Sequence, residues 1–252
     1  MGEEILTGEV RERSLIREIN EMVNSTDLVL EFLEACVHQI LYSKGVYPES
    51  VFEKRIKYGH QVFQSRHPDI NSYIRQVLGN AHPLVDAGLV ESVVVVLNRD
   101  LGGDGNRAVP VENIGISCAI AKRISTTLEG DKGDAMVTEE DPDNVVSDQI
   151  LFDLERDMKN ALIELMKMPK LPEENTHSWA IQVHTSKSSV GVDPQQDAVL
   201  RESLRSKEWK VDESEQAIPF SNNSMDDPRG LRGIGSFSNS IFSANMTRTT
   251  FS

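Results

Sequence analysis

The hydrophobic and polar positions of this chain predict that its most deeply buried helix lies within residues 28–42. Apolar residues recur there at helical spacing and continue beside that stripe, as Leu30, Leu33, Val37, Ile40 and Leu41 with Val29, Phe32, Cys36 and Tyr42. Only a narrow polar edge remains, so other elements should cover most of the helix surface. We expect candidate N-caps among the polar residues 24–27 and a left-handed C-cap at Gly45.

Two more helices follow from the same periodicity. Residues 68–78 place Ile70, Tyr73, Ile74, Val77 and Leu78 on one side, and we expect Gly79 and then His82-Pro83 to end that helix. Residues 145–168 place Ile150, Leu151, Leu154, Met158, Leu162 and Leu165 on one face, and Pro169 ends the helix. Residues 3–23 fit either an amphipathic docking helix or a solvated, partly helical extension.

The strands show a different pattern. Residues 91–97 form a nearly continuous β-branched run, typical of a strand that is buried on both faces. The glycine-rich residues 102–106 predict a hairpin turn rather than a phosphate loop, because no Gly-Lys-Ser/Thr follows, and residues 111–120 would then form the partner strand. Apolar and polar residues alternate over residues 179–185, which predicts a strand with one face exposed to solvent. Beyond residue 185 the regular signal fades, and the tail can form strands only where the body or a ligand offers an edge.

Composition narrows the function classes. The formal net charge of -14 argues against direct binding to nucleic acid, which needs clustered Lys and Arg. The basic run within residues 51–63 fits a solvated face better than a phosphate contact. The acidic residues 127–147 form a connector and do not match a calcium-binding loop. The central helix is too short and too charged to span a bilayer. Cys36 and Cys118 are the only cysteines, which fits a reducing compartment.

The residues give no sign of catalysis. Cys36 and His38 are two positions apart on one helix and point in different directions, so they do not form a nucleophile–base pair. The other histidines are isolated, with no spacing suited to a metal. We therefore expect no enzyme activity, no cofactor and no metal. An enzyme whose site is built from unrelated loops is the rival of a different class.

Five segments carry a resemblance to a known family. They are LEFLEACVHQILYSKGVYPESVFEKRIKYG (30–59), HPDINSYIRQVL (67–78), VESVVVVLNRD (90–100), WAIQVHTSK (179–187) and Asp227-Pro228-Arg229. Together they resemble the HORMA-domain family and, within it, the accessory subunits of DNA polymerase zeta. The resemblance implies an α+β fold in which three central helices pack on a mainly antiparallel β-sheet. It also implies a charged N-terminal extension over residues 1–24 and a HORMA domain over 25–252. Within that domain, residues 25–187 would be the core and residues 188–252 a C-terminal safety belt.

The same resemblance implies a function. The chain would be an adaptor that captures a proline-containing peptide of the polymerase zeta catalytic subunit under its belt. It would bridge that subunit to the C-terminal domain of a scaffold translesion polymerase, in DNA damage tolerance and repair in the nucleus, with the cytoplasm as a second location. An ATP-driven AAA+ remodeller and a second copy of the chain are further implied partners. The alternative within the fold is a checkpoint-type HORMA regulator of cell-cycle or mitotic factors.

Four residues occupy positions that matter in the family. Tyr73 and Trp209 match the aromatic residues that grip the peptide, and aromatic rings supply much contact area at low entropic cost. Leu231 matches a leucine of the second-partner interface. Lys159 falls where the family carries a basic residue at its dimer face. Core packing is the alternative role for Tyr73, and a solvated helix position is the alternative for Lys159.

Overall fold

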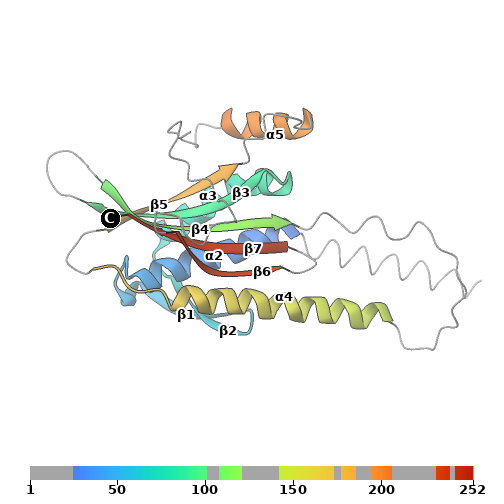
Figure 1. The fold of residues 1–252 in the computed structure, drawn as a ribbon, viewed down its shortest axis with the longest axis horizontal. Helices are drawn as coiled ribbons and strands as arrows, with labels where there is room; N and C mark the ends of the chain where they lie inside the picture. The colour runs from blue at the N-terminus through green and yellow to red at the C-terminus, as the bar shows by residue number, and fades with distance from the viewer. Residues whose placement is uncertain are drawn as a thin grey trace, which may run out of the picture.

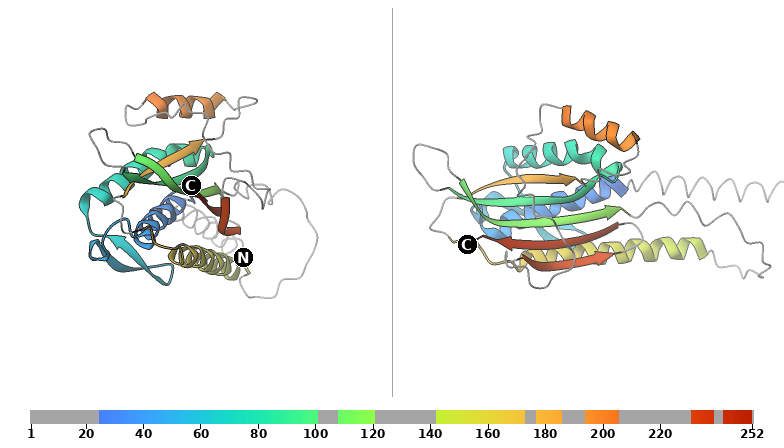
Figure 2. Two further views of the ribbon diagram at one scale, coloured as in Figure 1. Left: turned by 60° about the vertical axis from the view of Figure 1, so that its left-hand side comes forward. Right: turned by 45° about the horizontal axis from the view of Figure 1, so that its top comes forward.

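The computed structural model describes residues 25–100, 108–120, 142–172, 177–185, 194–205, 231–238 and 242–251. Three helices cover one face of a five-stranded antiparallel sheet (Figures 1 and 2). These three are α2 (Ser25–Lys44), α3 (Pro68–Asp86) and α4 (Pro142–Met166); a further described helix, α5 (Pro194–Arg205), contacts α3, and a 3₁₀ turn, η1, spans Glu49–Val51. The strands are β1 (Phe52–Lys57), β2 (His60–Ser65), β3 (Val90–Asp100), β4 (Ala108–Ile120), β5 (His177–Thr185), β6 (Leu231–Ser238) and β7 (Phe242–Thr250).

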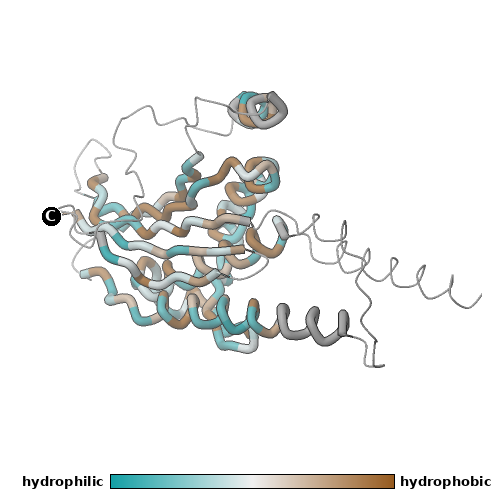
Figure 3. Tube along the Cα trace, turned by 45° about the vertical axis from the view of Figure 1, so that its right-hand side comes forward, coloured by the Kyte–Doolittle hydropathy of each residue, from teal (hydrophilic) through white to brown (hydrophobic). Residues whose placement is uncertain are grey.

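Helix α2 lies at the centre, as its hydrophobic pattern predicts. It packs against α3, α4, the hairpin strand β2 and the sheet strands β3 and β4. Most of its apolar residues are buried, with Leu28, Leu30 and Tyr42 partly buried, and Gly45 ends it with φ +66°. The hydropathy-coloured trace shows hydrophobic residues in both the helices and the strands of the two layers (Figure 3). His38, which the sequence places on a polar edge, is buried as well, and its Nδ1 accepts from the N–H of Ser65.

Helix α3 is longer than its sequence predicts. We expected it to stop at Gly79, but it continues through Gly79 and Pro83 to Asp86. Pro83 lacks the N–H that would bond one turn back, yet the apolar residues after Gly79 become buried, including Leu84 and Val85. Burial of these side chains offsets the lost hydrogen bond, and the helix ends only where Gly88 adopts φ +68°.

Strand β3 confirms the prediction of a strand buried on both faces, because residues 92–97 are all buried. Val93, Val95 and Leu97 join the core beneath the helices, and the alternate residues Val94 and Val96 are buried on the other face. The sheet order is β5-β3-β4-β7-β6, with every neighbouring pair antiparallel. Strands β5 and β6 are therefore the two edges of the described sheet.

The basic run within residues 51–63 forms the hairpin β1–β2. Its two-residue turn, Tyr58-Gly59, has positive φ at both positions (51° and 62°), which is the geometry of a type I′ turn. Lys57 of β1 pairs with Glu31 of α2, and Phe63 stacks on Tyr42 with ring centroids 3.6 Å apart. The hairpin is therefore bound to the helical layer by both charge and aromatic contact.

The C-terminal hairpin β6–β7 joins the sheet at β4, although no hairpin was predicted there. An aromatic trio of Phe32, Phe237 and Phe242 fixes it to α2, with centroid separations of 5.2–5.8 Å. Helix α4 lies beside β6, where a Cβ on Gly235 would approach Glu164 and Met246 within 3.3–3.6 Å. The strands form because β4 supplies an edge, as the sequence argument required. Helix α5, which we did not predict, begins beyond residue 193 and lies near α3.

Several expectations concern residues outside the described ranges. These are the N-terminal extension, the hairpin turn within residues 102–106, most of the acidic connector, and Trp209 with the Asp227-Pro228-Arg229 motif.

Candidate peptide-binding edge and a buried ionic cluster

Strand β5 offers an unpaired edge. Its only neighbour among the strands that the structure describes is β3, with Ile181 opposite Val95. An edge strand presents a row of main-chain donors and acceptors, which can pair with an incoming extended peptide. Helix α3 packs against β5 and lies close to α5 (Figure 1). The edge is thus bordered by helices rather than by another described strand.

Three aromatic residues gather at this edge, and we call them the edge cluster: Tyr47, Tyr73 and Trp179. Trp179 of β5 lies edge-to-face with Tyr73 of α3, with centroids 5.2 Å apart and planes at 73°. The indole N–H of Trp179 donates to the hydroxyl of Tyr47, which follows α2, at 2.8 Å. Tyr73 remains 36% exposed. The cluster therefore combines a fixed arrangement with an accessible aromatic surface, as a peptide contact requires.

Tyr73 also contacts the strand backbone. The main-chain N–H of Ile181 donates to the Tyr73 hydroxyl at 3.2 Å. Sequence reasoning selected Tyr73, but it did not select Tyr47 or Trp179. The available signal for Trp179 was its position in an alternating strand, whereas no local pattern marks Tyr47, which is 132 residues away in sequence from its partner.

The other predicted site residues are dispersed. Leu231 begins β6 and pairs with Thr249 of β7 at the opposite edge of the sheet from β5. Lys159 lies on α4 and is partly exposed. Trp209 lies outside the described residues. The structure therefore places Tyr73 at one edge of the described sheet and Leu231 at the other.

A buried ionic cluster of Lys44, Glu112 and Arg248 lies where α2, β4 and β7 meet. Lys44 is fully buried; its ammonium pairs with Glu112 and donates to the carbonyl oxygen of Pro169 at 3.2 Å. Arg248 donates to both oxygens of Glu112, at 2.6 and 3.1 Å. Burial lowers the pKa of Lys44, and Glu112 opposes that shift. No pattern in the sequence indicated that this lysine is internal.

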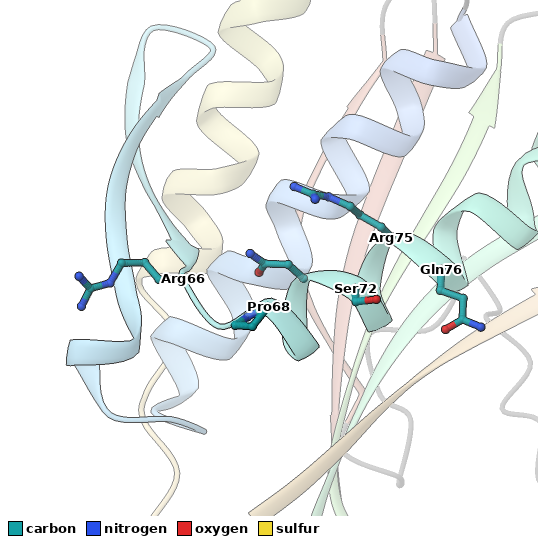
Figure 4. A pocket seen from close by; sticks show the side chains of 6 residues that line it. Arg66, Pro68, Ser72, Arg75 and Gln76 are labelled. Carbon is teal, nitrogen blue, oxygen red and sulfur yellow. The ribbon is translucent and has the colours of Figure 1, made fainter.

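Two hollows in the described part of the structure contain no catalytic arrangement. The larger, about 690 Å³, is an open groove along α3 and the residues before it. Its side chains diverge, with Arg66 and Arg75 on one side of the helix and Ser72 and Gln76 on the other (Figure 4). Arg75 is paired with Glu34 at 3.3 Å. The smaller cavity, about 120 Å³, lies between α4 and the C-terminal hairpin.

The groups with shifted pKa values line neither cavity. Burial raises the pKa of Cys36 well above its usual value, and also raises that of Cys118 to about 12. Within the described ranges no three His, Cys, Asp or Glu residues gather as a metal site. None of the described helices is long and apolar enough to cross a membrane.

Comparison with known proteins identifies the fold's relatives. The sequence profile of the HORMA domain matches residues 25–218. Human "Mitotic spindle assembly checkpoint protein MAD2B" is 48% identical over 71 residues, 28% of this chain and 34% of that protein. The "DNA polymerase zeta processivity subunit" of Schizosaccharomyces pombe is 32% identical over 103 residues, 40% of this chain and 48% of that protein. The matched segments thus span about a third to a half of these relatives' lengths.

Solved structures agree on the fold. A chain in "Crystal Structure of Mitotic Checkpoint Complex" superposes with a TM-score of 0.56 at 18% identity, over 90% of this chain and 95% of that one. Caenorhabditis elegans HTP-2, solved bound to the HIM-3 closure motif, gives 0.53 at 11% identity, over 90% and 89%. The profile covers well over half of the sequence, and the helices and antiparallel sheet agree with it. The chain therefore belongs to the HORMA-domain family.

Proposed function

We propose that this protein is a non-enzymatic adaptor that captures a proline-containing peptide of the DNA polymerase zeta catalytic subunit. The outer edge of β5, which pairs with no other strand that the structure describes and lies beside the edge cluster, is the observation that carries the proposal. An extended peptide that pairs with β5 gains main-chain hydrogen bonds, and the accessible ring of Tyr73 gives it an aromatic contact. Relatives named as polymerase zeta processivity subunits support this choice of partner.

In this proposal, residues 188–252 form a belt that closes across the captured peptide. A segment that closes over a bound peptide slows its dissociation, because the peptide can leave only after the segment opens. Trp209 would provide a second aromatic contact from the belt. The C-terminal hairpin β6–β7 is paired with β4, so among the described strands only β3 lies against β5.

The second part of the proposal concerns the opposite side of the molecule. Leu231, at the start of β6, would contact the C-terminal domain of a scaffold translesion polymerase. Lys159 on α4 would lie at the face where a second copy of the chain binds. An AAA+ ATPase would open the belt, and the adaptor would act in the nucleus without contacting DNA directly, in keeping with its net charge of -14.

The test is a calorimetric titration with a proline-containing peptide from the polymerase zeta catalytic subunit. We expect the parent protein to bind, and Tyr73→Ala and Trp209→Ala each to lose more than about 1 kcal/mol of binding free energy. Phe152→Ala is the matched control, because Phe152 is an exposed aromatic residue on α4, away from β5. No binding by the parent would refute the choice of partner.

A checkpoint-type regulator is the second candidate. Relatives named as mitotic checkpoint proteins, including mad2 of Schizosaccharomyces pombe at 29% identity over 89 residues, favour it. Both candidates use the same edge, so only the peptide distinguishes them. Binding of a peptide from a cell-cycle regulator, with no binding of the polymerase peptide, would select this second candidate.

A further inference from the structure

Tyr73 is placed to do more than contact a captured peptide. In an antiparallel sheet, the N–H and C=O of one residue point toward the same side of the strand, and successive residues alternate between the two sides. Ile181 donates its N–H to the Tyr73 hydroxyl, so this N–H is not directed at β3. It therefore belongs to the row of donors along the outer edge of β5, and it lies near the middle of that strand.

We propose that the Tyr73 hydroxyl guards the outer edge of β5, and that a captured strand must displace it from the Ile181 N–H. This inference rests on the proposed function and assigns separate roles to the two parts of one side chain. The ring supplies contact area for the peptide. The hydroxyl occupies the central main-chain donor until a peptide carbonyl replaces it.

The residues around Tyr73 hold its ring and hydroxyl in a defined position. Its ring is held edge-to-face against Trp179, and Trp179 is itself fixed by the hydrogen bond to Tyr47. Ile181 is buried, so the strand backbone at this point is held by the core. The hydroxyl and the N–H are thus each positioned by a fixed neighbour, although their residues are 108 positions apart in sequence.

An occupied donor has two consequences. Unpaired edge donors invite pairing with unrelated strands, so the hydroxyl protects the free protein from indiscriminate edge association. A correct peptide must break one hydrogen bond in order to form its own, and a typical intramolecular bond contributes a net 0.5–1.5 kcal/mol. By the usual conversion of free energy to equilibrium constants, removing the hydroxyl should therefore strengthen peptide binding by about 2- to 12-fold.

The first arm of the test needs no peptide. Hydrogen exchange at the Ile181 amide is measured by NMR in the full chain, the Tyr73→Phe variant and the Tyr42→Phe variant. Tyr42→Phe is the matched control, since it also removes one tyrosine hydroxyl, from a ring of α2 that stacks on Phe63 of β2 outside the edge cluster. We expect exchange at Ile181 to accelerate by about 2- to 12-fold in Tyr73→Phe, because an amide that loses its bond opens more readily. Equal exchange rates in all three proteins would overturn the proposal.

The second arm measures binding of the same polymerase peptide as above. We expect Tyr73→Phe to bind more tightly than the parent, Tyr73→Ala more weakly, and Tyr42→Phe within about 2-fold of the parent. If Tyr73→Phe lost as much affinity as Tyr73→Ala, the hydroxyl would contact the peptide instead of guarding the edge, and the proposal would fail. If the parent did not bind at all, the proposed partner would fail, while the exchange arm would still decide whether Tyr73 guards the edge.

Discussion

Replacing Glu112 with glutamine removes the only negative charge from the buried ionic cluster. Lys44 is fully buried, so in Glu112→Gln its ammonium keeps the Pro169 carbonyl and a neutral amide as partners. Breaking a buried ion pair costs about 3–5 kcal/mol, since it leaves an uncompensated buried charge. The Arg248 side chain is 23% exposed and can be hydrated again when Glu112 is replaced. We therefore expect the free energy of unfolding to fall by about 3 kcal/mol, the lower end of that range.

The assay is urea unfolding at neutral pH, followed by circular dichroism. A loss of about 3 kcal/mol should also lower the melting temperature by roughly 6–12 °C in a protein of this size. Adding Lys44→Met to Glu112→Gln should recover much of the loss, since the double variant no longer buries an unpaired charge. Arg156→Ala is the control, because its ion pair with Asp153 is solvent-exposed and should contribute less than about 1 kcal/mol. A Glu112→Gln protein within 1 kcal/mol of the parent would refute the reasoning.

Four further predictions concern Lys44 of the same cluster, the end of helix α3, the C-terminal hairpin and Cys36. Because folding lowers the pKa of Lys44, the unfolded chain binds more protons than the folded chain between that lowered pKa and 10.5, so the contribution of Lys44 to stability should rise with pH over that range. Cys36 and Cys118, whose pKa values are raised on folding, contribute in the opposite direction above 9.0, so the measurement is the difference in stability between the parent and Lys44→Met in urea titrations, which should rise with pH. Gly79→Ala should stabilise the protein by about 0.5–1 kcal/mol, because Gly79 lies inside α3 with open space around it. Gly88→Ala should lower the free energy of unfolding by about 1–2 kcal/mol, because Gly88 has φ +68° and a Cβ is strained there. If thermal melts showed equal effects for Gly79→Ala and Gly88→Ala, the observed end of α3 would be contradicted. Phe237→Ala should weaken the attachment of the C-terminal hairpin to the aromatic trio. Relative to the parent, amide exchange in this variant should therefore accelerate more in β7 than in β3. Cys36, buried and with a raised pKa, should react with a thiol reagent at neutral pH only after unfolding, and rapid labelling of the native protein would contradict its burial.

The sequence by itself determined the elements whose signal is local. The helical stripe of α2, the β-branched run of β3 and the alternation of β5 each depend on neighbouring residues, and the structure contains all three elements. The solvent-exposed face predicted for β5 is not present, because its residues are half-buried on both faces and Ile181 is buried. The HORMA resemblance also followed from short continuous segments, and the family profile confirms it. Periodicity shows which face of an element is apolar, which is sufficient to predict that the element is buried.

Only the tertiary structure decided where these elements meet. Local signals predicted that α3 ends at Gly79, but α3 continues to Asp86 because Leu84 and Val85 become buried. Lys44 appears polar in sequence, yet it is internal because β4 and β7 bring it the charges of Glu112 and Arg248. The bond between Tyr73 and Ile181 depends on the packing of α3 against β5. Such contacts join residues far apart in the chain, and their free energy exists only once the sheet and helices have packed together.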